Sequence, residues 1–147
     1  MKFNMFIREA KIIDAKFLFN LKNDKDVRKW SIASKDKIKW DSHLKWFNKH
    51  IKKIFIIYHN GERAGDIRLE GDEIAIKIDK RARGNGLAGY AIGIARISCN
   101  KLIAKIVDGN VPSMRLFIKN DFKVVDHKVT NGVGYYILKY ENNTLRT

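Results

Sequence analysis

Three glycines in the spacing GxGxxG, at Gly84, Gly86 and Gly89, lie within the stretch IAIKIDKRARGNGLAGYAIG of this 147-residue chain. The residues before the glycines alternate as in a β-strand, and those after them repeat at helical spacing. In such a loop, consecutive backbone N–H groups can turn towards one point, and the following helix adds its positive end. Lysine and arginine side chains immediately before the glycines add full charges. The stretch therefore predicts a cradle for a phosphate-bearing ligand, most simply a pyrophosphate.

A dinucleotide-binding fold is one alternative for this spacing. Asp108 follows about 20 residues later, where such folds place a ribose-binding acid. Two features argue against that fold. The segment DKRAR separates Ile78 from the first glycine, and a row of hairpin strands stands where one βαβ half would be. The string GxxxxGK[ST] of nucleoside-triphosphate loops does not occur in the sequence.

Hydrophobic periodicity predicts the element order β α α β β β α β α β β. Strands are expected at 3–10, 53–59, 63–70, 73–79, 102–108, 122–129 and 134–140, and helices at 12–24, 40–51, 87–101 and 111–121. Turn residues between neighbouring strands predict hairpins, whereas the helical crossover from 73–79 to 102–108 predicts one parallel pair. We therefore expect a single α+β domain over residues 1–147, with helices flanking a mixed, mostly antiparallel sheet.

The same periodicity predicts helix ends and buried faces. Asp14 is expected to cap the first helix, and Pro112 fits the first turn of the last one. The expected buried faces are Phe17, Leu18 and Leu21 in the first helix, Trp40, Leu44, Phe47 and Ile51 in the second, and Leu87, Tyr90, Ala91, Ile94 and Ile97 in the third.

The composition narrows the class of protein. No run of about 18 apolar residues and no leader-like N-terminus is present, so we expect a cytoplasmic protein without a membrane partner. Cys99 is the single cysteine, which excludes an internal disulfide and a multi-cysteine zinc site; no metal is expected. The net charge of +14 is concentrated in residues 1–60 (15 Lys/Arg, 6 Asp/Glu). Its scattered lysines favour a solvated surface over a nucleic-acid partner.

The glycine stretch resembles the signature [QR]xxGx[GA] of the GNAT superfamily, the acetyl-coenzyme A dependent N-acetyltransferases. It matches twice in overlapping frames, as RARGNG from Arg81 and as RGNGLA from Arg83. The string DGNVPSMRLFIKNDF, from Asp108 to Phe122, is similar to the family's strand, Asn, helix and LYxKxGF segment. The resemblance implies the GNAT fold, in which the strands at 73–79 and 102–108 splay apart, and acetyl-coenzyme A as cofactor.

The resemblance also implies which residues hold the cofactor. Loop amides would bind the pyrophosphate of coenzyme A, and main-chain groups of the preceding strand would meet the pantetheine and the acetyl carbonyl. The implied cofactor-binding residues are Lys77, Ile78, Arg81, Arg83, Gly84, Asn85, Gly86, Leu87, Ala88, Asn110 and Phe117. For Asn110 a simple helix cap is an equal alternative.

Phe117 stands where the family usually has the tyrosine that protonates the leaving thiolate. The alternatives are solvent or another group, with Tyr135 or Tyr136 on the last hairpin as candidate donors. Three residues are candidates for the general base: Glu70 and Glu73 beside the fourth strand, and His43, whose ordinary pKa of about 6.5 suits proton transfer. His43 lies off the apolar stripe of its helix, which is typical of a surface histidine.

The segment from Leu21 to Phe47 is similar to the acceptor region of GNAT enzymes that acetylate nucleotide-linked amino sugars, as in the pseudaminic acid pathway. The matching residues are Asn23, Arg28, Trp30, His43 and Trp46, while Lys22 replaces an arginine. The implied function is acetylation of a small primary amine of this kind. Acetylation of a protein N-terminus or lysine, or a non-catalytic coenzyme A or RNA-binding module, are the alternatives. Monomer and homodimer both remain open.

Overall fold

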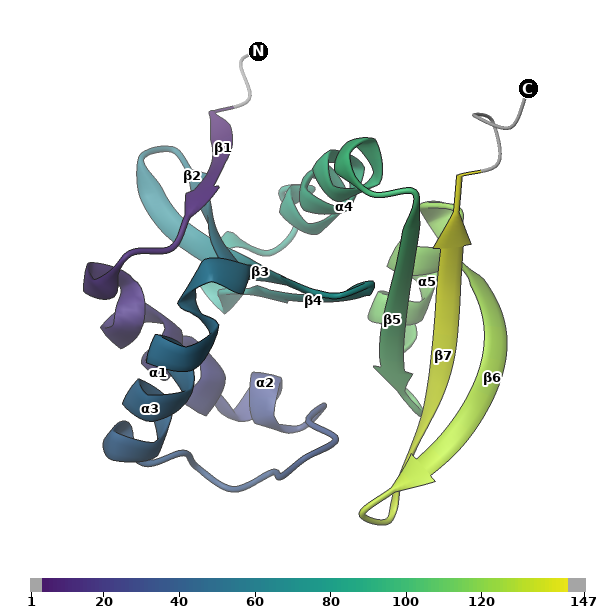
Figure 1. The fold of residues 1–147 in the computed structure, drawn as a ribbon, viewed down its shortest axis with the longest axis horizontal. Coiled ribbons are helices and arrows are strands. Elements are labelled where there is room, and N and C mark those ends of the chain that lie inside the picture. The colour runs from purple at the N-terminus through teal and green to yellow at the C-terminus, as the bar shows by residue number, and fades with distance from the viewer. Residues whose placement is uncertain (1–3, 143–147) are drawn as a thin grey trace.

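The computed structural model describes residues 4–142, which form one seven-stranded sheet with helices on both sides (Figure 1). The strands are β1 (Met5–Glu9), β2 (Ile54–His59), β3 (Glu62–Glu70), β4 (Glu73–Ile78), β5 (Lys101–Val107), β6 (Lys123–Thr130) and β7 (Val133–Glu141). The helices are α1 (Ala15–Asn23), α2 (Lys25–Arg28), α3 (Trp40–His50), α4 (Leu87–Ser98) and α5 (Val111–Lys119). The predicted order is confirmed, with the short α2 added in the segment expected to be a loop.

Strands β4 and β5 are the parallel pair that the crossover predicts, within the sheet order β1-β2-β3-β4-β5-β7-β6. Their pairing in the described residues consists of one register position, Glu73 opposite Ile103. Beyond it the strands diverge, and Figure 1 shows β4 running away from β5. On its β5 side, β4 therefore has no strand partner after Glu73, which leaves main-chain N–H and C=O groups facing the opening.

Two apolar clusters cover the two faces of the sheet. Helices α4 and α5 pack on one face, over the buried side chains of β4, β5 and β7. Helices α1 and α3 pack on the other face, where Leu18 and Phe47 meet Ile54 and Ile56 of β2. Because side chains alternate along a strand, β2 serves both clusters, with Ile57 turned to the α4 side.

Two predicted helix faces need correction. In α4 the buried residues are Leu87, Ala91, Ile92 and Ala95, whereas Ile94 and Ile97 are 40% and 84% exposed. In α3, Trp40 of the predicted buried face is 39% exposed, whereas His43, which lies off that face, is 1% exposed. Both errors arise from the width of an apolar stripe: a helix can turn by one residue and still present apolar side chains to the sheet.

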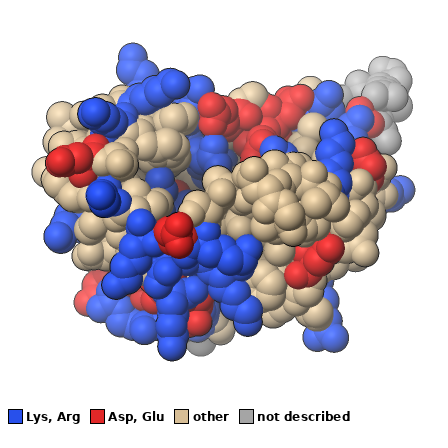
Figure 2. All heavy atoms as spheres, turned by 90° about the horizontal axis from the view of Figure 1, so that it is seen from below, with Lys and Arg blue, Asp and Glu red and all other residues tan. Residues whose placement is uncertain are grey.

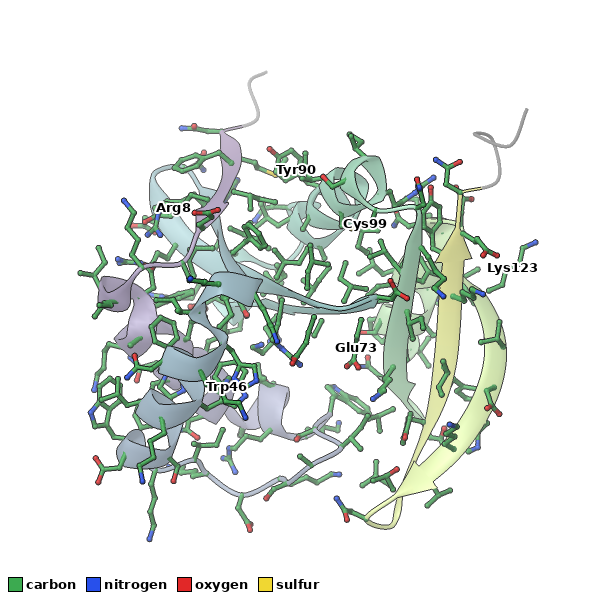
Figure 3. All side chains as sticks on the ribbon, in the orientation of Figure 1. Arg8, Trp46, Glu73, Tyr90, Cys99 and Lys123 are labelled. Atoms are coloured by element: carbon green, nitrogen blue, oxygen red, sulfur yellow. The ribbon has the colours of Figure 1, made fainter. Side chains whose placement is uncertain are left out.

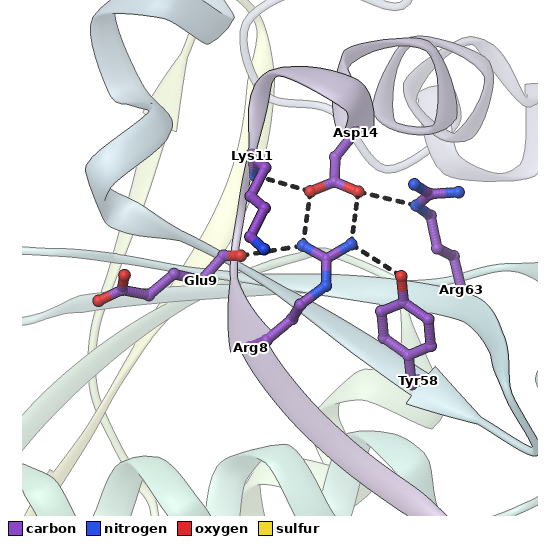
Figure 4. Close-up of polar contacts among 6 residues, drawn as sticks. All are labelled: Arg8, Glu9, Lys11, Asp14, Tyr58 and Arg63. Atoms are coloured by element: carbon purple, nitrogen blue, oxygen red, sulfur yellow. Dashed lines mark hydrogen bonds and ion pairs between the residues drawn. The ribbon is translucent and has the colours of Figure 1, made fainter.

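Asp14 occupies the N-cap position of α1, but its carboxylate makes no capping bond to that helix. It is fully buried and accepts hydrogen bonds from Arg8 Nη1 (2.7 Å) and Nη2 (2.8 Å), Arg63 Nε (2.7 Å) and the Lys11 amide (2.7 Å) (Figure 4). Arg8 also donates to the Tyr58 hydroxyl at 2.7 Å. These contacts tie the start of α1 to strands β1, β2 and β3, and so position the helix that faces the sheet.

Within residues 4–142, every helix is too short or too polar to cross a membrane.

Candidate functional site

The glycine loop and the start of α4 surround a pocket of about 170 Å³. It lies at the end of β4 where that strand has left β5, and α5 closes it with Leu116. The lining residues are Ile78, Ala82, Arg83, Gly84, Gly86, Leu87, Ala88, Gly89 and Leu116. Six of them, all except Ala82, Gly89 and Leu116, were predicted to bind the cofactor.

The backbone of this loop has the conformation that the glycines permit. Gly84 and Gly86 have φ angles of +82° and +73°, and a Cβ at either position would meet nothing within 4 Å. Gly86 caps α4, and its carbonyl accepts the Tyr90 amide at 3.0 Å. The first N–H groups of a helix have no partner within the helix, so those of the first turn of α4 are available to an anion beside the pocket.

The arginines that begin the two overlapping matches to the signature, Arg81 and Arg83, lie in different places. Arg83 lines the pocket, with its Nε donating to the Ile78 carbonyl at 3.2 Å. Arg81 lies instead in an ion pair with Asp79 at 2.9 Å and lines a different cavity of about 400 Å³ beside Arg63. The second frame, RGNGLA, therefore supplies the arginine next to the glycines.

Besides Arg81, four predicted cofactor residues do not line this pocket. Asn85 donates to the Ala82 carbonyl at 2.9 Å, which fixes the loop from within. Asn110 accepts from the Ser113 amide at 3.4 Å, as the helix-cap alternative expects. Phe117 is buried in the core, with its ring 4.9 Å from that of Phe122 in an edge-on arrangement. Lys77 directs its side chain to the other face of the sheet, where it meets Asp66.

That other face carries a polar cluster that the sequence did not reveal. Lys22 of α1 lies with its Nζ 2.8 Å from the ring centroid of Trp46 on α3. Asp66 of β3 is 1% exposed, and its Oδ1 lies 3.1 Å from Lys77 Nζ of β4. Arg68 of β3 lies 5.9 Å from the same Trp46 ring. Only the packing of α1 and α3 on the sheet brings these residues together, since they span residues 22 to 77 of the chain.

His43 belongs to the packing between α3 and α1. Its Nε2 lies 2.8 Å from the Ala15 carbonyl, and its Nδ1 has no hydrogen-bond partner. The rings of Phe19, Trp40 and Phe47 lie within 6.0 Å of it. Burial lowers its pKa below the ordinary value, because the charged imidazolium would lose its hydration. This placement leaves His43 no solvent contact through which to exchange a proton with an acceptor.

The two carboxylates predicted as bases have different surroundings. Glu70 accepts hydrogen bonds from Lys53 at 3.2 Å and from Arg68 at 2.7 Å. The bond from Lys53 has the larger effect, and both lower the pKa of Glu70. Glu73 lies at the point where β4 and β5 separate, 3.3 Å from Lys105 Nζ of β5 (Figure 3). Of the two, Glu73 is the one placed at the opening of the strands.

Tyr135, the predicted proton donor, is buried on β7, with its hydroxyl 3.0 Å from the Thr130 hydroxyl. Its ring belongs to the strand that pairs with β5, opposite Val107.

Asn23 and Arg28, predicted to bind the acceptor, hold a chain segment in place. Asn23 donates to the Ile38 carbonyl at 2.9 Å and accepts the Ile38 amide at 2.7 Å. Arg28 donates to the carbonyls of Asn23 (3.1 Å) and Lys35 (3.0 Å). The segment 29–39 is thereby fastened between α2 and α3, along the lower edge of the molecule in Figure 1.

The two tryptophans predicted for the acceptor are partly covered by neighbouring side chains. Trp30 has Lys29 Nζ at 4.8 Å from its ring centroid. Trp46 stacks on the His50 ring at 4.7 Å and carries Lys22 over its ring.

The structure is similar to several solved acetyltransferases. It aligns with the acetyltransferase (GNAT family) from Bacillus anthracis with a TM-score of 0.76 and 18% identity, over 93% of this chain and 94% of that one. It aligns with spermidine N-acetyltransferase from Vibrio cholerae in complex with CoA and spermine with a TM-score of 0.78 and 16% identity, over 97% of this chain and 98% of that one. It aligns with ribosomal-protein-alanine N-acetyltransferase from Brucella melitensis with a TM-score of 0.72 and 18% identity, over 92% of this chain and 99% of that one.

This chain has the GNAT fold. No protein-family profile and no curated protein matches its sequence. The fold prediction is confirmed, with the mixed sheet and the diverging β4 and β5. The GNAT fold also excludes the doubly wound dinucleotide topology, because the described sheet has a single parallel pair.

Proposed function

We propose that this protein transfers an acetyl group from acetyl-coenzyme A to a primary amine. The observation that carries the proposal is the glycine pocket, which combines the start of α4, two left-handed glycines and Arg83 beside the end of a strand that has left its neighbour. The Vibrio cholerae structure of the same fold was solved with CoA. In this role the pocket takes the pyrophosphate, and the opening between β4 and β5 takes the pantetheine arm.

The residues of the loop fit such a ligand. The amides at the start of α4 donate to phosphate oxygens, and the guanidinium of Arg83 adds a positive charge. The thioester supplies an activated acyl carbon. The Asp79 amide donates to Ala64 of β3, so by strand alternation the main chain of Ile78 lies on the opposite edge of β4, towards the opening. In this proposal the Ile78 N–H would stabilise the negative charge that develops on the carbonyl oxygen. The amine forms a bond to the carbonyl carbon as the carbon–sulfur bond breaks.

Two protons have to move. The acceptor ammonium gives up one before it reacts, and the departing thiolate takes one up. We assign the first to the Glu73 carboxylate, acting directly or through a water, because Glu73 stands where β4 and β5 separate. Phe117 has no proton to donate, so the thiolate receives its proton from Tyr135 or from solvent.

For the acceptor we propose the amine of a nucleotide-linked amino sugar or a similar small molecule. The support is the resemblance of residues 21–47 and the fastening of segment 29–39 by Asn23 and Arg28, which favours a covered site over an open peptide groove.

A non-catalytic module that binds coenzyme A or RNA is the second candidate. Lys and Arg side chains gather on the lower face of the molecule (Figure 2). Helix α2 and segment 29–39 lie at the bottom of the molecule in Figure 1, the side that Figure 2 shows. They contribute Lys25, Arg28, Lys29, Lys35, Lys37 and Lys39. Such a surface attracts polyanions. A thiol-release assay separates the two functions, because only the enzyme consumes acetyl-coenzyme A.

The first test is coenzyme A binding by Gly86→Asp, measured by calorimetry. The new carboxylate lies at the start of α4, beside the proposed pyrophosphate, and we expect about 30-fold weaker binding, or about 2 kcal/mol. Gly132→Asp is the matched control, because Gly132 has a similar φ of +75° in the β6–β7 turn and an added Cβ there meets nothing within 4 Å. Absent binding to the natural chain, or equal binding by Gly86→Asp, contradicts the proposal.

A second test addresses the base. We expect Glu73→Gln to lower kcat for acetyl transfer by about 100-fold, because an amide cannot take up the acceptor's proton. Coenzyme A affinity should stay unchanged, which calorimetry measures on the same sample. Glu62→Gln, an exposed carboxylate at the start of β3, serves as the control. An unchanged kcat for Glu73→Gln removes Glu73 from this role.

A further inference from the structure

Three cationic side chains converge on the sheet face that α1 and α3 cover. They are Lys22 of α1, Arg68 of β3 and Lys77 of β4, and the Trp46 ring of α3 lies against the first two. Figure 3 labels Trp46 on α3. Lys77 stands near the end of β4, the strand whose main chain is proposed to hold the acyl group. The cluster therefore lies where an acceptor would approach the acyl carbon from the face opposite α4.

The carboxylates of this cluster are already committed. Asp66 lies 3.1 Å from Lys77 Nζ, and Glu70 is shared by Arg68 (2.7 Å) and Lys53 (3.2 Å). Among the described residues, Lys22 forms no ion pair with a carboxylate and has the Trp46 ring as its contact. Lys53, Arg68 and Lys77 thus share two carboxylates, and Lys22 adds a further basic group, which leaves the cluster with an excess of positive charge.

The side chains that carry this positive charge are partly buried, but solvent and ligands can reach them. Lys22 is half-buried, and the side chains of Lys77 and Arg68 are 18% and 24% exposed. Burial of Lys22, followed by repulsion from Lys77, lowers its pKa to about 7. A cation without a counter-ion in such a place is unfavourable, and an anionic ligand would relieve both the repulsion and the unpaired charge.

We propose that Lys22, Arg68 and Lys77 form an anion subsite, which selects acceptor amines that carry a carboxylate or phosphate group and disfavours polyamines. The inference rests on the proposed function, because it places the acceptor on this side of β4. It goes beyond that function by naming the charge of the acceptor and the residues that recognise it. Polyamines carry only positive charges, and the three cations repel them.

The subsite predicts a pH dependence of acceptor binding. The groups facing Lys22 are Lys77, Asp66 and Arg68 of the sheet and Trp46 and His43 of α3. An anion favours the protonated form of Lys22. We therefore expect binding of an anionic acceptor to take up a proton and to weaken as the pH rises from about 6 to about 8.

The experiment uses acceptor pairs that differ by one anionic group. Glucosamine and glucosamine 6-phosphate test phosphate, alanine amide and alanine test carboxylate, and spermidine tests the polyamine class. Each is titrated by calorimetry into the protein saturated with coenzyme A, and each is assayed for thiol release with acetyl-coenzyme A. We expect the anionic member of at least one pair to bind about tenfold or more tightly than its neutral partner, and spermidine to bind most weakly.

Variants of Lys22 show whether the cluster is responsible. Lys22→Met keeps an apolar stem on the Trp46 ring and removes the charge, and Lys22→Gln tests the same loss with a polar side chain. Both should lose about tenfold in affinity for the anionic compound and little for the neutral one. Lys45→Gln, on the exposed side of α3, should change neither.

The outcomes separate this inference from the proposed function. Coenzyme A that binds, together with equal affinity for both members of each pair or a preference for spermidine, overturns the anion subsite alone. An equal effect of the Lys22 variants on charged and neutral acceptors does the same. If coenzyme A does not bind, the proposed function fails, and titration of the same pairs into the free protein still decides whether the anion subsite exists.

Discussion

Asp14→Asn should destabilise the protein by about 3 kcal/mol at neutral pH, measured by urea denaturation. The carboxylate is fully buried between Arg8 and Arg63, and it also accepts the Lys11 amide. An amide of the same shape keeps the packing but leaves two guanidinium groups without their counter-ion. We expect the lower part of the range for broken buried ion pairs, because both arginines keep some solvent contact.

The matched control is Asp72→Asn. Asp72 pairs with Lys101 at 3.3 Å, but the two side chains are 50% and 43% exposed, so we expect a loss below about 1 kcal/mol. A similarly small loss for Asp14→Asn would contradict a structural role for the buried network.

The lowered pKa of Asp14 predicts that the folded protein loses stability in acid. Hydrogen bonds from Arg8, the Lys11 amide and Arg63 outweigh the effect of burial and hold the pKa of Asp14 at about 2, below its ordinary 3.8. A lowered pKa stabilises the folded state fully above about pH 4, and this contribution of about 2 kcal/mol is lost as the pH falls through 2. The difference in unfolding free energy between the natural chain and Asp14→Asn should therefore shrink over this range.

Gly65→Ala is expected to destabilise the protein by about 3 kcal/mol and to weaken coenzyme A binding. A Cβ at Gly65 would lie 2.3 Å from the Lys77 carbonyl oxygen, and that atom belongs to the backbone. Relief of the clash requires β3 and the end of β4 to move apart, and Ile78, which pairs with Gly65, lines the pocket. Denaturation and calorimetry on one preparation measure both effects.

Gly93→Ala is the matched control in the same protein. Gly93 lies inside α4, where an added Cβ meets nothing within 4 Å, and alanine favours a helix over glycine. We expect an unchanged or higher stability, by up to about 1 kcal/mol. If Gly65→Ala is equally harmless, the approach of β3 to β4 does not constrain the pocket.

The fold could be predicted because the signals that set each helix and strand lie within short stretches of the sequence. The strands end at turn residues, such as the Asn60-Gly61 pair between β2 and β3, whose φ angles of +53° and +81° match a hairpin turn. The parallel contact of β4 with β5 followed from the helix between them. Most of the glycine pocket was equally local, since all its lining residues except Leu116 of α5 lie in the continuous stretch from Ile78 to Gly89.

The sequence alone determined the order of the strands along the chain, the glycine loop and the resemblance on which the proposed ligand, coenzyme A, rests. The tertiary structure decided which arginine lies beside the glycines, where His43 is buried, and that Asn23 and Arg28 fasten the chain. It also assembled Lys22, Arg68 and Lys77 from one helix and two strands. The physical reason is that periodicity reports which face of an element is apolar, whereas contacts between distant side chains depend on how helices rotate and pack on the sheet.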